Sequence, residues 1–463
     1  MPYSTVNPYT GELLATFANA TDEEISQAIT QADQTFQEWK LSSFQTRREI
    51  LQRAADLLRS NVDYYAKFLT LEMGKIFAEA KAEVELSAQI FEYYVKYAEK
   101  LLQDEPLQVA DPATGNAVLV HEPLGVLLAV EPWNFPYYQI ARIIAPQLSA
   151  GNTILLKHAS NVPQCAQVFE KLMLEAGLPN GAFINLFLSH DKVETVLKDP
   201  RVYGVALTGS EGAGSAIAAL AGKYMKKSTL ELGGADAFIV LADADLDKTV
   251  NWAVFGRHWN AGQVCVSSKR MIIDASIYDE FLAKYIAQVE LLKAGDPMDP
   301  ATQLAPLSSQ KAADDVRKQI DNAIAHGATA IEVGAPVPSQ GAFVQPTILT
   351  DIDASNPAYY EEFFGPVSML FKAENEADAV RIANDSNYGL GGSVFGRDVK
   401  HAKEVAMQIQ TGMVFVNHPT MVKADLPFGG IKRSGYGREL LGLGLKEFVN
   451  IKLVDVVDID AAF

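Results

Sequence analysis

The chain has 463 residues, 48% of them hydrophobic and 21% charged, so we expect a globular protein of two or three domains. Its formal net charge of −18 argues against nucleic acid or an anionic membrane as a partner, and no apolar run reaches the roughly 18 residues of a membrane span. The only two cysteines, Cys165 and Cys265, cannot form a disulfide framework and the N-terminus has no signal-peptide pattern, so we expect a cytoplasmic protein.

The first 120 residues carry structural signals but no signs of chemistry. Residues 3–20 hold short β-like pieces around a turn, and residues 21–103 follow a helical pattern rich in Glu, Gln, Lys and Ala. Two β-prone pieces, Leu107–Val109 and Ala117–His121, flank the turn Asp111–Gly115 and predict a hairpin.

From Gly125 onward, apolar runs alternate with helix-like segments. The runs are Gly125–Val130, Thr153–Leu156, Phe183–Phe187, Val202–Leu207 and Ala237–Leu241. This alternation is typical of βαβ units and predicts a doubly wound parallel sheet. Because ligands of such sheets bind beyond the carboxyl ends of the strands, the residues that follow each run are candidates for a site.

Polar residues and glycines follow three of these runs, at Glu131–Pro136, Lys157–Ser160 and Thr208–Ser210. The sequence contains neither the G-x-G-x-x-G fingerprint nor a Walker A loop. Three glycines between residues 209 and 214 open a predicted helix, which fits phosphate binding and a plain tight turn about equally well.

Cys265 is a candidate nucleophile. It lies in the uncharged run Asn260–Ser268, just before Lys269 and Arg270. A thiolate is the reactive form and an ordinary thiol is mostly protonated at neutral pH, so a working cysteine needs help from its surroundings. The alternative is that Cys265 is a small buried hydrophobic residue.

Two residues near strand ends could support a reactive thiol. Asn134 can donate its side-chain amide to the oxyanion that forms when a thiol attacks a carbonyl, or it can cap the helix that begins near Pro136. Glu231 can act as a general base if its surroundings raise its pKa, or it can be a solvated glutamate.

Six short motifs span most of the chain: PWNFP at 132–136, LTGS at 207–210, ELGG at 231–234, GQVC at 262–265, EEFFGPV at 361–367 and PFGG at 427–430. In this order and spacing they resemble the aldehyde dehydrogenase superfamily, and the resemblance covers essentially the whole chain. Each motif alone is weak, whereas six in register are very specific.

The resemblance implies an α/β fold of three parts. These are a Rossmann-like parallel-sheet NAD(P)-binding domain (1–105 and 124–232), an α/β catalytic domain (233–433) and a small β oligomerisation segment (106–123 and 434–463). Members of the family pair through these β segments, so we expect a homodimer or homotetramer. Without a partner, the largely apolar stretch Ile451–Val457 would be an exposed edge strand.

The resemblance also implies roles for individual residues. Cys265 is expected to attack an aldehyde, Asn134 and the Cys265 N–H to stabilise the oxyanion, and Glu231 to direct the water that hydrolyses the thioester after hydride transfer to nicotinamide. No metal is expected. The residues expected to line the cofactor are Trp133, Asn134, Lys157, Ser160, Gly209, Ser210, Leu232, Glu362 and Phe364, with Glu362 holding the nicotinamide ribose.

The helix after Asn134 departs from broad-specificity members in a way that resembles the succinate-semialdehyde dehydrogenase branch. It carries Tyr138 and Arg142, which lie with Asn134 along one stripe at i, i+4 and i+8. We therefore expect Arg142 and Tyr138 to bind the distal carboxylate of a short semialdehyde such as succinic semialdehyde. The alternative is an arginine paired with one of the protein's own carboxylates; Arg257 and His258 are weaker candidates for a second anchor.

Ser160 stands where NAD-selective members have a glutamate. A glutamate would repel a 2′-phosphate, whereas Ser160 offers a hydroxyl donor and Lys157 supplies a positive charge. We therefore expect NADP as the preferred cofactor and NAD as a poorer substitute. The alternative is that Ser160 only ends a strand or caps a helix, with the preference set elsewhere.

Other functions compete with a semialdehyde dehydrogenase. One is an aldehyde dehydrogenase of broader specificity, another is a thiol esterase or hydrolase, and a third is a non-enzymatic structural or binding protein. A hydrolase needs no ribose-binding glutamate, so Glu362 argues against it. The joint presence of Cys265, Glu231 and Asn134 argues against a non-enzymatic role.

Overall fold

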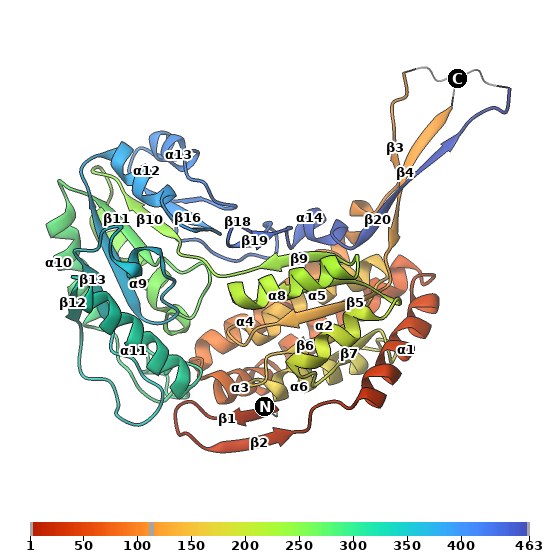
Figure 1. The fold of residues 1–463 in the computed structure, drawn as a ribbon, viewed down its shortest axis with the longest axis horizontal. Coiled ribbons are helices and arrows are strands. Elements are labelled where there is room, and N and C mark those ends of the chain that lie inside the picture. The colour runs from red at the N-terminus through yellow and green to blue at the C-terminus, as the bar shows by residue number, and fades with distance from the viewer. Residues whose placement is uncertain (1–2, 111–114, 461–463) are drawn as a thin grey trace.

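The computed structural model describes residues 3–110 and 115–460, which form two α/β lobes and a projecting β arm (Figure 1). The first lobe contains a six-stranded sheet and the second a seven-stranded sheet, and the arm has three strands. The α/β class with parallel-sheet lobes that the sequence predicts is confirmed.

The first sheet is parallel except at one edge. Its strands β5 to β9 run parallel, while β19 pairs antiparallel with β9. The central strands are buried on both faces, which explains their continuous apolar runs. In spatial order the strands are β19 (Gly435–Tyr436), β9 (Lys227–Glu231), β8 (Val202–Thr208), β5 (Val126–Glu131), β6 (Thr153–His158) and β7 (Phe183–Asn185).

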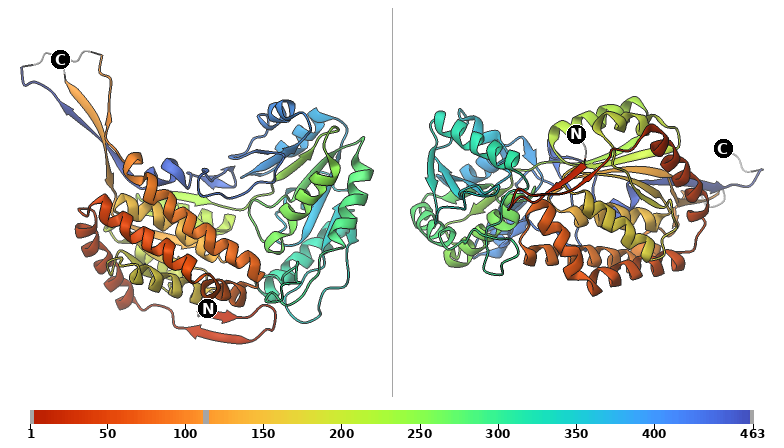
Figure 2. Two further views of the ribbon diagram at one scale, coloured as in Figure 1. Left: turned by 180° about the vertical axis from the view of Figure 1, so that it is seen from behind. Right: turned by 90° about the horizontal axis from the view of Figure 1, so that it is seen from below.

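Helices cover both faces of this sheet (Figure 2). On one face lie α2 (Phe44–Ser60), α3 (Val62–Met73), α4 (Phe77–Leu101), α5 (Pro136–Ala150) and α6 (Pro163–Glu175). On the other lie α1 (Asp22–Trp39), α7 (Val193–Lys198) and α8 (Glu211–Lys223). All 15 residues of α5 are buried, so this helix runs through the centre of the lobe and begins directly after β5.

The second lobe, like the first, has a mostly parallel sheet with one antiparallel edge strand. Among its seven strands only β12 is antiparallel to its neighbour. In spatial order its strands are β12 (Thr329–Glu332), β13 (Thr347–Thr350), β14 (Val367–Ala373), β11 (Arg270–Asp274), β10 (Ala237–Val240), β16 (Gly392–Phe395) and β17 (Phe415–Val416). Its helices are α9 (Leu246–His258), α10 (Tyr278–Val289), α11 (Gln310–Ala325), α12 (Glu376–Asn384) and α13 (Val399–Ala406), with 3₁₀ turns η2 (Trp259–Gly262) and η3 (Pro357–Tyr360).

The arm consists of β3 (Glu105–Pro106), β4 (Asn116–Pro123) and β20 (Val449–Val456). β20 pairs antiparallel with β4 from Val449 opposite Pro123 to Val456 opposite Asn116. The predicted hairpin is present, but its first strand lies at 105–106 rather than 107–109, and most of the predicted turn lies outside the described residues.

Short elements complete the chain: β1 (Tyr3–Val6), β2 (Leu13–Phe17), η1 (His190–Lys192), β15 (Tyr388–Gly389), β18 (Ile431–Lys432) and α14 (Leu441–Lys446). The predicted domain boundaries stay predictions. Within the predicted segment 434–463, β19 extends the first sheet and α14 packs on α4 and α5, so only β20 belongs to the arm. None of the helices in the described ranges is both long enough and apolar enough to cross a membrane.

Candidate active site

Cys265 lies in a loop whose backbone is held in an unusual conformation. After α9, Asn260, Ala261 and Gly262 have φ values of 50°, 53° and 75°, in the left-handed region that non-glycine residues rarely adopt. The Glu79 carboxylate accepts hydrogen bonds from the Asn260 N–H at 3.0 and 3.2 Å, which compensates for part of this strain. At Gly262 a Cβ would collide with the carbonyl of Gly365.

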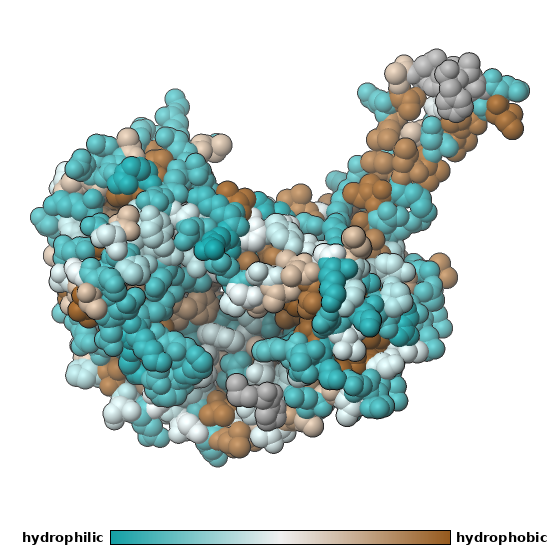
Figure 3. Space-filling model, viewed as in Figure 1, coloured by the Kyte–Doolittle hydropathy of each residue, from teal (hydrophilic) through white to brown (hydrophobic). Residues whose placement is uncertain are grey.

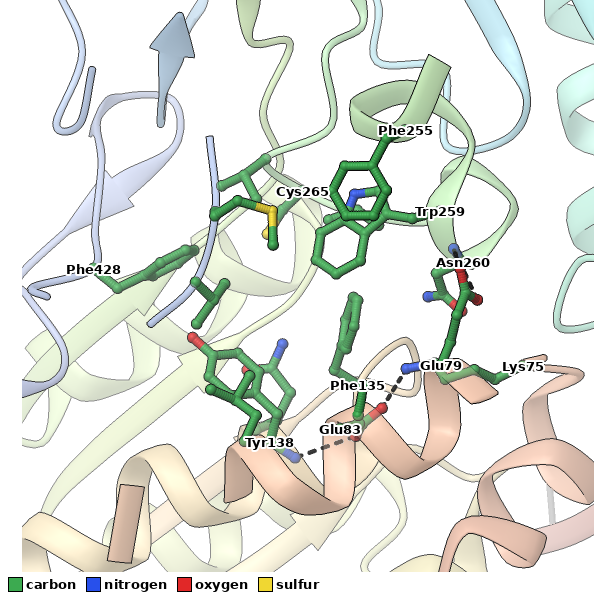
Figure 4. Close-up of a pocket in the computed structure, with 17 residues that line it drawn as sticks. Lys75, Glu79, Glu83, Phe135, Tyr138, Phe255, Trp259, Asn260, Cys265 and Phe428 are labelled. Atoms are coloured by element: carbon green, nitrogen blue, oxygen red, sulfur yellow. Dashed lines mark hydrogen bonds and ion pairs between the residues drawn. The ribbon is translucent and has the colours of Figure 1, made fainter. Parts of the chain in front are cut away.

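Two cavities meet at Cys265. The first, about 280 Å³, lies between α4, α5, α9 and the loop 421–428, and we call it the aldehyde cavity (Figure 4). The second, about 250 Å³, lies beyond the carboxyl ends of β5, β8 and β9, and we call it the cofactor groove. A residue that faces both cavities can react with molecules that enter from two sides. The sequence alone could not establish that two cavities meet at Cys265.

Asn134 is buried beside the cofactor groove and is fixed by its neighbours. Its side-chain amide donates to the carbonyl of Gln263 at 3.1 Å, and its own carbonyl accepts from Lys75 Nζ and Asn260 Nδ2, both at 3.0 Å. Since an amide nitrogen carries two hydrogens, one remains to donate to an oxyanion on a carbon bound to Cys265. Asn134 does not cap α5: the N-cap residue is Phe135, and its side chain makes no capping hydrogen bond.

A buried ion pair that no motif of the sequence marks supports Asn134. Lys75 and Glu83 are paired, with side chains 0% and 1% exposed. The Glu83 carboxylate also accepts from the N–H groups of Tyr137 and Tyr138, at 2.9 and 3.2 Å, in the first turn of α5. The pair thus fixes both the Asn134 carbonyl and the helix that follows it. The only local signal is that Lys75 stands alone between apolar residues.

The surroundings of Cys265 favour the thiol over the thiolate. Burial raises its pKa to about 12, although the charge of Lys269 acts in the opposite direction. Lys269 Nζ donates to the carbonyls of Val264 and Cys265, both at 2.7 Å, and pairs with Glu362 at 3.0 Å. Lys269 therefore joins the nucleophile loop to a glutamate of the cofactor groove, while Arg270 lies against the rings of Tyr359 and Phe371.

Glu231 is a buried carboxyl whose surroundings raise its affinity for a proton, as a general base needs. It is 1% exposed and its oxygens have no hydrogen-bond partner among the described residues. Burial and the charge of Glu439 hold its pKa well above the usual range. Its carboxylate lies against Gly429, where a Cβ would approach Oε1 to 2.7 Å, and it is not part of either cavity wall. The solvated-surface alternative does not fit this burial.

Most residues predicted to line a cofactor lie around the groove. The wall contains Trp133, Asn134, Gly209, Ser210, Leu232, Glu362 and Phe364 together with Cys265. Ser210 caps α8 through its hydroxyl, which accepts from the Ala213 N–H at 3.3 Å, so the first N–H groups of this 13-residue helix begin beside the groove. A helix N-terminus next to an open groove fits a nucleotide phosphate. The individual roles stay predictions.

Lys157 and Ser160 lie outside this wall, Lys157 near the end of β6 and Ser160 just after it. Lys157 is buried, and burial lowers its pKa to about 8, with no carboxylate among the described residues to counter that effect. Ser160 is exposed, and its carbonyl accepts from the Ser4 N–H at 2.9 Å. A buried ammonium without an anionic partner fits a phosphate. Between them, the His158 ring lies 3.1 Å from the carbonyls of Glu131 and Pro136 and so braces the loop that carries Asn134.

Tyr138 and Arg142 are placed differently. Tyr138 lines the aldehyde cavity, whereas Arg142 is 1% exposed and lies outside its wall. The Arg142 guanidinium pairs with Glu439 and donates to the hydroxyls of Tyr138 at 3.0 Å and Thr208 at 2.7 Å. This geometry matches the alternative of an internal ion pair. The carboxylate-anchor role stays a prediction, and it would require Arg142 to exchange Glu439 for the substrate.

Of the two weaker candidates for an anchor, Arg257 holds the nucleophile loop and His258 bonds to the Tyr285 hydroxyl. Arg257 is buried and donates to the carbonyls of Phe363 and Val367, at 2.8 and 2.6 Å, and to the Ser267 hydroxyl at 2.7 Å. Burial lowers the pKa of His258 to about 3, so its ring is neutral. Neither residue lines the aldehyde cavity.

Comparison with known proteins covers nearly the whole chain. The model of the aldehyde dehydrogenase family matches residues 1–454. The succinate-semialdehyde dehydrogenase [NADP(+)] of Deinococcus radiodurans is 48% identical over 98% of this chain and 94% of that protein. The succinate-semialdehyde dehydrogenase [NADP(+)] 1 of Mycobacterium tuberculosis is 46% identical over 98% of this chain and 99% of its own.

Solved structures agree. The succinic semialdehyde dehydrogenase of Streptococcus pyogenes, crystallised with NADP⁺, has a TM-score of 0.96 and 48% identity, covering 98% of this chain and 100% of that one. The NAD-dependent aldehyde dehydrogenase of Sinorhizobium meliloti has a TM-score of 0.96 at 28% identity, covering 100% and 92%. With a family model that matches residues 1–454 and relatives that are 46–48% identical over 98% of its length, this chain belongs to the aldehyde dehydrogenase family.

Proposed function

We propose that this protein oxidises a short semialdehyde, succinic semialdehyde first among them, to the carboxylic acid with NADP. The observation that carries the chemistry is the position of Cys265 at the junction of the aldehyde cavity and the cofactor groove, next to the fixed amide of Asn134. The names of the relatives that match nearly the full chain support the substrate and the cofactor.

Each catalytic residue has one task in this reaction. The Cys265 sulfur attacks the aldehyde carbon while Asn134 Nδ2 and the Cys265 N–H donate to the oxyanion, which can lower the barrier by roughly 3–4 kcal/mol per donor. When bound, the nicotinamide accepts the hydride that the thiohemiacetal carbon loses. Glu231 then takes a proton from the water that hydrolyses the thioester, so the aldehyde loses two electrons and water supplies the second oxygen of the acid.

Lys157 and Ser160 support NADP rather than NAD. The unpartnered Lys157 ammonium can hold a phosphate, and the exposed Ser160 hydroxyl can donate to one of its oxygens. A glutamate at position 160 would place a negative charge next to this phosphate and repel it. NAD remains a poorer substitute in this proposal.

A spectrophotometric assay tests the proposal directly. We expect succinic semialdehyde to drive formation of NADPH, and of NADH more slowly, and we expect the Cys265→Ala variant to form neither. Hydrolysis of an ester such as p-nitrophenyl acetate, with no nucleotide reduced in the presence of any aldehyde, would identify a thiol hydrolase. Comparable rates with many unrelated aldehydes would identify an aldehyde dehydrogenase of broader specificity.

We also propose a homodimer or homotetramer that assembles through the arm and works in the cytoplasm. The arm exposes Ile451, Leu453 and Val456 by 49%, 59% and 67%, and Figure 3 shows apolar side chains along its length. Such an edge is stabilised when a partner covers it. The free thiols of Cys165 and Cys265 suit a reducing compartment. Light scattering of Leu453→Asp, which should lower the molar mass, tests the assembly.

A further inference from the structure

The Lys269 ammonium is buried, and all three of its hydrogens have acceptors. The carbonyls of Val264 and Cys265 accept two of them, both at 2.7 Å, and the Glu362 carboxylate accepts the third at 3.0 Å. The Lys269 side chain is 0% exposed, whereas Glu362 lines the cofactor groove. Among the described residues, the one carboxylate within salt-bridge distance of Lys269 is therefore also one that a ligand of the groove can reach.

A ligand that binds Glu362 through both carboxylate oxygens competes with Lys269. Glu362 Oε1 accepts from Lys269 Nζ and from the Gly234 N–H, at 3.0 and 3.1 Å, so this oxygen has no further lone pair to offer. A ribose diol that donates one hydroxyl to each oxygen must displace one of these two donors. The Gly234 N–H is held in the backbone, so the flexible Lys269 side chain is the donor that yields. A buried ammonium that loses its anion is strongly destabilised, unless a second carboxylate takes over.

Asp236 offers such a carboxylate, and it has no part in the oxidation of the aldehyde. It is 2% exposed and directly precedes β10. Its Oδ1 accepts from the Gly391 N–H at 3.0 Å, and its Oδ2 has no hydrogen-bond partner among the described residues. Burial raises the pKa of Asp236 to about 7, and the charge of Lys269 acts against that rise. Asp236 thus has a free oxygen near Lys269 and changes its charge near neutral pH.

Lys269 is the cation with the largest effect on Asp236. The other titratable groups that face this carboxyl are Glu362, whose charge adds to the rise in the pKa of Asp236 that burial causes, and the Cys265 thiol. The side chain of Thr420 and the Gly391 N–H complete the surroundings, and neither carries a charge. An ionised Asp236 therefore has Lys269 as its natural partner.

We propose that Asp236 is a positioning residue that replaces Glu362 as the partner of Lys269 when the nicotinamide ribose of the dinucleotide occupies Glu362. This inference rests on the proposed function for the ligand of the groove. The exchange keeps Lys269 neutralised and bonded to the carbonyls of Val264 and Cys265, so the nucleophile loop keeps its position in both states. No covalent bond to carbon or sulfur changes: a protonated Asp236 releases its proton to the solvent as it pairs with Lys269, and takes one up again when the dinucleotide leaves.

Binding of NADP should therefore release protons from Asp236. A group that is about half protonated at pH 7 becomes ionised when it pairs with Lys269, so we expect roughly half a proton per site at pH 7 and almost none at pH 9, where Asp236 is already ionised. Isothermal titration calorimetry in buffers of different ionisation enthalpy measures this number. The 2′-phosphate can exchange protons too, so the decisive quantity is the difference between the wild type and Asp236→Asn.

Adenosine 2′,5′-bisphosphate is the matched ligand control, because it carries the 2′-phosphate but has no nicotinamide ribose to reach Glu362. It should release the same number of protons from the wild type and from Asp236→Asn. For NADP, equal release from the two proteins overturns the inference. If NADP does not bind and NAD does, the cofactor assignment fails, and the same comparison with NAD, against AMP as its control, decides the inference.

The exchange of carboxylates can also be tested without a dinucleotide. In Glu362→Gln, Asp236 should pair with Lys269, and in Asp236→Asn, Glu362 keeps that pairing. Each single variant should therefore lower the thermal unfolding midpoint Tm by less than about 2 °C. The double variant leaves the buried ammonium without a carboxylate, and its Tm should fall by at least about 4 °C more than the sum of the single effects.

The matched control combines Glu362→Gln with Glu72→Gln. Glu72 is a buried glutamate of the first lobe whose carboxylate accepts from the Cys165 N–H at 2.8 Å, so these two effects should add. Additive effects for Asp236→Asn and Glu362→Gln would instead show that Asp236 does not take over Lys269, and would overturn the inference. If neither dinucleotide binds, the proposed function fails, and this cycle alone decides the pairing of Asp236 with Lys269.

Discussion

The cofactor groove and the aldehyde cavity meet at one cysteine but are built in different ways. The groove is made of residues that directly follow strands, such as Trp133 after β5 and Gly209 after β8. The cavity is made of side chains from helices and a loop that lie far apart in the sequence, such as Lys75 and Phe428. The groove therefore has a signature in the sequence, whereas the character of the cavity appears only after folding.

The largest expected effect lies at the junction of the two regions. Cys265→Ala should lower turnover by at least about a thousandfold, because no other group at the junction can form the thioester. Cys165→Ala is the matched control, since Cys165 is fully buried in the core of the first lobe. Steady-state NADPH formation checks both. Retention of more than a few per cent of turnover by Cys265→Ala would contradict the mechanism.

The buried cavity also sets the reactivity of the thiol. Because the pKa of Cys265 is raised to about 12, its thiolate fraction should rise about tenfold per pH unit, or about a hundredfold between pH 7 and pH 9. The rate of inactivation of the cofactor-free enzyme by iodoacetamide measures this. A rate that levels off below pH 8 would mean that the charge of Lys269 outweighs burial.

The role of Arg142 determines whether the substrate site extends beyond the apolar wall of the aldehyde cavity. We expect Arg142→Met to destabilise the protein by about 3–5 kcal/mol, because Glu439 would be left buried without its partner. Activity should fall by the same factor for succinic semialdehyde and butyraldehyde. The double variant Arg142→Met/Glu439→Gln should recover part of the stability in thermal unfolding. A loss confined to succinic semialdehyde would instead support the anchor role predicted from the sequence.

A Lys75 variant tests whether the buried ion pair beside the aldehyde cavity supports the Asn134 amide. Lys75→Met should lower kcat by about tenfold to a hundredfold and leave KM nearly unchanged, because the Asn134 amide acts mainly in the transition state. Lys81→Met, on the helix α4 that follows Lys75, is the control: its lysine pairs with Asp63 on the surface and should not affect kcat. A parallel change in KM would point to a general loss of structure.

The smallest expected effect concerns the groove alone. Ser160→Glu should lower kcat/KM for NADP by at least tenfold and leave that for NAD unchanged, because the new carboxylate repels a 2′-phosphate. Ser160→Ala removes only the hydroxyl and should lower kcat/KM for NADP about threefold. A wild type that prefers NAD, or a Ser160→Glu variant with unchanged preference, would contradict the cofactor assignment.

The sequence predicted the parts of the molecule that depend on residues close together in the chain. The apolar runs at β5, β6 and β8 are strands of one parallel sheet, and the six motifs place Cys265 and Asn134 at the site. It could not predict Glu439 as the partner of Arg142, since nearly 300 residues separate them and neither is marked by its neighbours. A stripe on α5 shows only which residues share a side of the helix, and here that side also packs against Glu439 and Thr208.

The pairing of Lys75 with Glu83 constrains how this site can diverge over evolutionary time. Glu83 also caps α5 through two backbone N–H groups, so losing it first would leave an ammonium and two donors unsatisfied at once. Losing Lys75 first leaves a carboxylate that still accepts from two N–H groups. Divergent lineages should therefore replace position 75 before position 83, and sequences with an apolar residue at 83 and a lysine at 75 should be rare.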